Sequence, residues 1–161
     1  MQRVINEARR HGLALGFADL EPPTRAVFMA DEWMIAISDK LDEDQAADSG
    51  AHELGHFVNG DRCSTPEAEE RAWIYASRIR VDFHEYRDAE LEDPHPLAIA
   101  QKLGTTRHIV ELFQKHHLER LMLSAPRNIF GEYIDDGDED ALETRHSLAI
   151  PVRRSLCRLA S

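Results

Sequence analysis

Apolar residues near the start of the chain change from a helical spacing to short extended runs. In MQRVINEARRHG (residues 1–12) they recur at positions 4, 5 and 8, which predicts a helix ending at Gly12. Three short apolar runs follow, separated by turn-forming residues such as the Pro22-Pro23 pair. These runs cover residues 13–17, 26–30 and 33–38. We therefore expect three short strands, the last two joined as a hairpin through Asp31 and Glu32.

From Asp42 onward the pattern is mostly helical. Asp42 can cap a helix through DEDQAADSGAHELGHFVNG, which ends at Gly60. The sequence STPE, with Thr65 before a proline, predicts the start of a second helix that reaches about Val81. Later helical patterns cover residues 97–103 and 105–123. Strands followed by helices predict an α+β fold: a small antiparallel or mixed sheet packed on the HELGH helix, then a mainly helical C-terminal half.

This pattern also divides the chain. We expect one domain over residues 1–123, which includes the helical pair at 95–123, and a C-terminal tail over residues 124–161. The tail contains an acidic run at 135–140, which lacks the ligand spacing of a calcium-binding loop. We interpret that run as a solvated loop.

Composition narrows the class of protein. The chain has 161 residues, and its 19 Lys and Arg against 30 Asp and Glu give a net charge of −11, which repels nucleic acid and anionic lipid. No apolar run approaches the roughly 18 residues that span a bilayer, and the first twelve residues lack the apolar stretch of a signal peptide. Cys63 and Cys157 are far apart in sequence and are interpreted as two free thiols. These features predict a cytoplasmic protein.

The strongest chemical signal is HELGH, from His52 to His56. Residues four apart share one face of a helix, so both imidazoles can reach one metal ion. Glu53 is turned about 100° around the helix axis, where it can take a proton from a water on the metal instead of binding the ion itself. Imidazole and carboxylate ligands with one open position are typical of catalytic zinc, which makes a small zinc-dependent peptidase our main hypothesis.

A third ligand is expected from the second helix. Its acidic candidates are Glu67, Glu69 and Glu70. Glu69 heads a pattern whose other members can form the packed face of the helix, and Glu70 is a close competitor one residue further on. At least two of the three carboxylates are interpreted as favourable charge at a helix N-terminus.

The segment AHELGHFVNGDRCSTPEAEERAWIYASRI resembles the core of the ImmA/IrrE family of zinc metallopeptidases, most closely its short phage and actinobacterial members. The matched positions are His52, Glu53 and His56, followed by Glu69, Ala72, Tyr75 and Ala76. The resemblance covers residues 33–121 with falling strength. It departs from the family at Trp73, where members often carry Asn or Asp as a partner for a ligand histidine.

The resemblance implies a gluzincin-like fold in which Zn²⁺ is bound by His52, His56 and Glu69, with Glu53 as general base. It also implies cleavage of a protein partner, and in several members this partner is a repressor of phage or mobile-element type. We expect a substrate peptide to add to a sheet edge, and the strand at 33–38 is the candidate for that edge.

A transition-state stabiliser is not identified by any motif. A Tyr, His or Arg commonly assists the metal in this role. The candidates are His84, Tyr86, Tyr75, Arg80 and His95.

Two alternative functions follow from the same sequence. Residues 95–121 have the pattern of a helix-turn-helix: a short helix, a turn at Gly104 and a longer helix. This pattern would make the chain a DNA-binding regulator. Its few basic residues and the acidic chain argue against nucleic acid as a partner. The other alternative is a non-catalytic interaction module stabilised by zinc, in which Glu53 would have no purpose.

Overall fold

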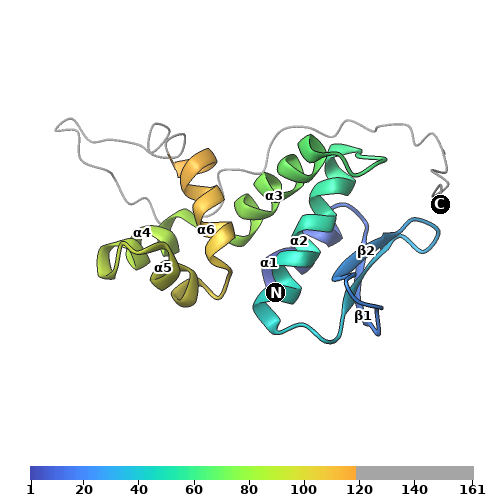
Figure 1. Ribbon diagram of the computed structural model, residues 1–161, viewed down its shortest axis with the longest axis horizontal. Helices are drawn as coiled ribbons and strands as arrows, with labels where there is room; N and C mark the ends of the chain where they lie inside the picture. Colours follow the sequence, from blue (N-terminus) through green and yellow to red (C-terminus); the bar gives the residue numbers. More distant parts are fainter. Residues whose placement is uncertain (119–161) are drawn as a thin grey trace. The chain divides into compact units, whose positions relative to one another are not determined.

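The computed structural model describes residues 1–118 and has an α+β fold, as predicted. Its elements are α1 (Gln2–Arg10), β1 (Ala14–Ala18), β2 (Ala26–Met29), β3 (Met34–Ser38), α2 (Glu43–Asn59), α3 (Pro66–Arg80), α4 (Phe83–Glu92), α5 (Pro96–Leu103), α6 (Arg107–Phe113) and the π-helical turn η1 (Gln114–Leu118). Figure 1 shows their arrangement. The predicted tail at 124–161, with its acidic run and Cys157, lies outside the described residues, as does the boundary at 123.

The three strands form a mixed sheet in the order β1-β3-β2. β3 pairs in parallel with β1 and antiparallel with β2, so β2 and β3 form the predicted hairpin. The strand at 33–38 is therefore central and is not the sheet edge that we expected. Its sequence explains this: Ile35, Ala36 and Ile37 are all buried, as both faces of a central strand require. The edges of this sheet are β1 and β2.

Local signals set the ends of α2 and α3. The Asp42 carboxylate accepts a hydrogen bond from the backbone N–H of Gln45, and Gly60 ends α2 in the left-handed conformation with φ of 68°. Thr65 caps α3 in the same manner, through the N–H of Ala68, with Pro66 in the first turn. Both helices thus begin and end within a residue or so of the predicted positions.

One helix was not predicted. α4 is mostly polar, and only Tyr86 and Ala89 among its residues are buried, so its apolar periodicity is weak. The Asp82 carboxylate starts it by accepting hydrogen bonds from the N–H groups of His84 and Glu85.

α2 contributes to both apolar clusters of the core. Its Leu54 belongs to a cluster with Ile35 and Ile37 of β3, and its Ala51 to a cluster formed mainly with the later helices. Figure 1 shows α2 between α3 and the sheet. The helix that carries HELGH is thus held by side chains on several faces, which fixes its orientation.

A buried polar network links α2 to the later helices. Asp48 and Arg80 are only 2% and 6% exposed, and Nε of Arg80 donates to Oδ1 of Asp48 over 2.5 Å. Asp48 also accepts from the hydroxyl of Thr105 and the N–H of Thr106, and Arg80 donates to the carbonyl of Gly104. The two charges are paired with each other and hydrogen-bonded to further groups, which makes their burial tolerable. The turn between α5 and α6 is thereby attached to α2 and α3.

No helix within residues 1–118 combines the length and apolar character needed to cross a membrane.

Candidate metal centre

His52, His56 and Glu69 converge at one point between α2 and α3. The two Nε2 atoms are 3.1 Å apart, and the Glu69 oxygens lie 3.1 Å from Nε2 of His52 and 3.3 Å from Nε2 of His56. Tetrahedral zinc with ligand bonds of about 2.0–2.1 Å holds neighbouring ligand atoms about 3.3 Å apart. Two imidazole nitrogens and one carboxylate are also the donor set of many catalytic zinc sites. The described residues therefore form a cluster that could hold a zinc ion.

Gly55 lets α3 approach α2 closely enough for this convergence. A Cβ atom at position 55 would lie 2.6 Å from the carbonyl oxygen of Ala72 and 2.8 Å from its Cα. Ala72 is one turn after Glu69 on α3, so this contact sets the height at which Glu69 meets the two histidines. The presence of glycine at position 55 is thus explained by the close packing of α3 against α2.

We expect Gly55→Ala to lower the free energy of unfolding by about 1–3 kcal/mol and to weaken metal binding, because helix backbone has to move apart. Gly50→Ala is the matched control. Its Cβ would lie 2.8 Å from Cδ1 of Ile37, the end of a flexible side chain, so the gain in helix propensity of about 1 kcal/mol can offset the repacking. Denaturant unfolding and metal titration measure both effects. Equal behaviour of the two variants would contradict this role of Gly55.

The electrostatics favour neutral imidazole and ionised carboxylate. Burial, followed by the neighbouring His56, lowers the pKa of His52 to about 4, against the opposing effect of Glu69. A hydrogen bond of 2.6 Å from the Ser64 hydroxyl is the largest cause that lowers the pKa of Glu69. Both shifts favour the protonation states in which His52 and Glu69 can bind a metal ion.

His56 is oriented by a carboxylate. Its Nδ1 lies 3.1 Å from Oδ2 of Asp61, whose Oδ1 accepts from Arg71 over 2.5 Å. Burial alone would raise the pKa of Asp61, but the hydrogen bonds from Arg71 and His56 outweigh it and lower the pKa. An ionised carboxylate can only accept, so Nδ1 of His56 carries the proton and the Nε2 lone pair faces the cluster.

Glu53 lies beside the cluster without joining it. Burial is the largest cause that raises the pKa of Glu53, with Glu69 acting in the same direction. His56 and a backbone hydrogen bond from Phe28 oppose this shift. The carboxyl group is therefore close enough to His56, Glu69 and the backbone of Phe28 to interact with each, and its pKa lies above that of an ordinary glutamate.

The competing acidic residues of α3 lie elsewhere. The Glu70 side chain is 58% exposed and its nearest cation is Lys115, 3.9 Å away. Glu67 is exposed in the first turn, and the pKa of its carboxyl is lowered chiefly by its own backbone N–H and by Thr65. Neither carboxylate belongs to the cluster of His52, His56 and Glu69.

The candidates for a transition-state stabiliser are not gathered at the cluster. Tyr86 is fully buried and donates to Glu90, Tyr75 donates to Glu7 of α1, and Arg80 is part of the Asp48 network. His84 is exposed on α4, and Nδ1 of His95 accepts from the N–H of Leu97 at the start of α5. The two tyrosines and Arg80 thus make hydrogen bonds within the fold, and a role for any of the five in the transition state stays a prediction. Cys63 is exposed in the loop between α2 and α3.

Sequence reasoning missed Asp61 and Ser64, which hold His56 and Glu69. Both lie in the short loop between α2 and α3, within five residues of the side chain that each supports. A polar loop between two ligand-bearing helices is the signal that could have identified them.

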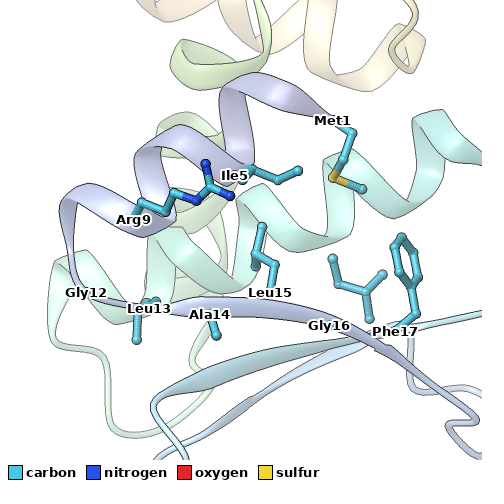
Figure 2. A pocket seen from close by; sticks show the side chains of 10 residues that line it. Met1, Ile5, Arg9, Gly12, Leu13, Ala14, Leu15, Gly16 and Phe17 are labelled. Carbon is cyan, nitrogen blue, oxygen red and sulfur yellow. The ribbon is translucent and has the colours of Figure 1, made fainter.

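A separate cavity of about 540 Å³ lies between α1 and β1. Figure 2 shows Ile5 of α1 and Leu15 of β1 at this cavity, with Arg9 and Phe17 at its margins. None of its lining residues belongs to the metal-ligand cluster. Comparison with protein family descriptions, with curated proteins and with solved structures found no match to this chain.

Proposed function

We propose that this chain is a zinc-dependent endopeptidase that cleaves a protein partner. The observation that carries the proposal is the convergence of His52, His56 and Glu69 with ligand atoms 3.1–3.3 Å apart, beside a glutamate that is not a ligand. Zinc bound there would supply Lewis acidity and a water of lowered pKa. A repressor of phage or mobile-element type is the substrate class that the sequence resemblance suggests.

Glu53 is proposed as the general base. It is within the electrostatic influence of His56 and Glu69, so its carboxylate can take the proton of a water that attacks the scissile carbonyl. The protonated Glu53 can then return the proton to the leaving amine. A purely structural metal site has no use for such a group, which argues against the interaction-module alternative.

β2 is proposed as the strand that receives the substrate. It is an edge of the sheet, and the backbone of Phe28 hydrogen-bonds to Glu53. An extended peptide paired with β2 would therefore run past the general base. Val27 is 38% exposed on this strand, which leaves apolar surface for substrate side chains.

Residues of the helix-turn-helix segment (95–121) pack within the fold, which offers an alternative explanation to DNA binding for this pattern. Ile109, Val110 and Phe113 of α6 are buried, and Arg107 is ion-paired with Glu111 over 2.7 Å. The preceding turn is anchored to Asp48. We therefore favour the peptidase over the DNA-binding alternative, which stays a prediction of the sequence alone.

The primary test compares two adjacent glutamates. Purified wild-type protein is expected to contain about one zinc per chain, and Glu69→Gln is expected to weaken zinc binding at least about 100-fold, because a charged ligand becomes a neutral amide. Glu70→Gln, one residue away and exposed, should bind zinc as the wild type does. Zinc content and chelator competition measure this. Stoichiometric zinc in Glu69→Gln, or none in the wild type, would reject the site.

A further inference from the structure

The two histidines of the cluster are supported in different ways. Nδ1 of His56 is held by Asp61, whereas Nδ1 of His52 is buried and has no hydrogen-bond partner among residues 1–118. A histidine that binds metal through Nε2 ordinarily donates its other N–H to a carboxylate, carbonyl or water, which fixes the ring. Within the described residues, the orientation of the His52 ring therefore depends on its packing, because the χ2 torsion of histidine has only broad preferences.

Trp73 lies against the ring of His52. The two ring centroids are 4.1 Å apart and the planes are inclined by 35°, so the rings meet in a close, tilted stack. Trp73 comes from α3, one turn after Glu69, so the helix that supplies the carboxylate ligand also supplies this contact.

The indole of Trp73 is itself held in place. It packs against the apolar cluster formed by α2 and the later helices, and the His108 ring of α6 meets it edge to face with centroids 5.1 Å apart. A rigid aromatic face thus restricts the plane in which His52 can lie.

We propose that Trp73 is a positioning residue for the metal site: its indole face holds His52 in the plane that directs Nε2 to the ion, since residues 1–118 supply no hydrogen-bond acceptor for Nδ1. The inference rests on the proposed zinc site. It assigns the two histidines unequal support, with His56 oriented by the Asp61 carboxylate and His52 oriented by stacking.

The test separates stacking from simple burial by comparing Trp73→Leu with Trp73→Phe. Leucine keeps an apolar side chain without a π face, and phenylalanine restores the face. We expect Trp73→Leu to weaken zinc binding by about tenfold or more, as loss of a supporting group typically does, and Trp73→Phe to stay within about threefold of wild type. Trp33→Leu is the matched control, since Trp33 is 45% exposed and its ring contact is with Phe57, which is not a metal ligand. Chelator competition gives the dissociation constants.

The visible spectrum of the Co²⁺-loaded protein reports ligand geometry directly. It should change in Trp73→Leu and be restored in Trp73→Phe. If Trp73→Leu keeps wild-type zinc affinity and an unchanged Co²⁺ spectrum, the inference is overturned. A lower melting temperature alone would not rescue it, because that result would show only that Trp73 contributes to packing.

Fluorescence keeps the inference testable if Trp73→Leu does not fold. Trp33→Phe leaves Trp73 as the emitting indole, and Co²⁺ should quench its emission more strongly than it quenches Trp33 in Trp73→Phe, because the Trp73 ring contacts His52 directly. Equal quenching in the two proteins would overturn the inference. Failure of wild-type protein to bind zinc would instead reject the proposed function, so the two failures are distinguishable.

Discussion

Glu53→Gln is expected to retain zinc and to lose about 100-fold to 10,000-fold in the rate of peptide cleavage, the usual contribution of a positioned general base. Glutamine has nearly the same shape as glutamate but cannot accept a proton from water. Glu53 is not among the converging ligands, so its charge is not needed to hold the metal. His52→Ala, in contrast, should lose zinc and activity together.

Cleavage can be measured by mass spectrometry on a library of peptides, or on a repressor protein co-expressed from a neighbouring gene, with zinc content determined on the same samples. Glu70→Gln is the control for the general effect of a Glu-to-Gln exchange, because the Glu70 side chain is exposed and outside the cluster. Equal cleavage by wild type and Glu53→Gln would remove Glu53 from the mechanism and would favour a structural role for the metal.

Asp48→Ala is expected to lower the free energy of unfolding by about 3–5 kcal/mol, the cost of breaking a buried ion pair by removing one partner. The change leaves the Arg80 guanidinium buried without its counter-charge and takes the acceptor from Thr105 and Thr106. Because α2 carries both histidines, and the same network holds it to α3, weaker metal binding should accompany the lost stability.

Urea unfolding of the metal-free protein measures this effect without a contribution from bound zinc. Asp88→Ala is a suitable control, since the Asp88 side chain is 64% exposed and its pairing with Arg87 is long at 3.6 Å; we expect a change below about 1 kcal/mol there. The double variant Asp48→Leu with Arg80→Met should recover part of the loss, because no unpaired charge then remains. A loss in Asp48→Ala as small as in the Asp88 control would show that water reaches Arg80.

Together the two experiments separate chemistry from architecture. Glu53 acts on the reacting water and should leave the fold unchanged. Asp48 lies one turn before His52 on α2 and should affect activity only through the position of the helices. We thus expect Glu53→Gln to lose activity while keeping its metal and stability, and Asp48→Ala to lose stability and metal affinity together.

The sequence by itself determined the features that depend on near neighbours. The four-residue spacing of His52 and His56 puts both rings on one helical face, and the caps at Asp42, Thr65 and Gly60 set where the helices begin and end. These features need only local hydrogen bonds and the helical period, so they could be predicted before any tertiary contact was known.

Only the tertiary structure decided which distant groups meet. The pattern of 33–38 predicted a strand but not its central place in the sheet, because strand order depends on pairing between segments far apart in sequence. The weak periodicity of α4 hid a helix whose Tyr86 is fully buried in the core. The stack of Trp73 on His52 requires α2 and α3 to cross at Gly55, which is set by close packing between two helices and not by the sequence of either one alone.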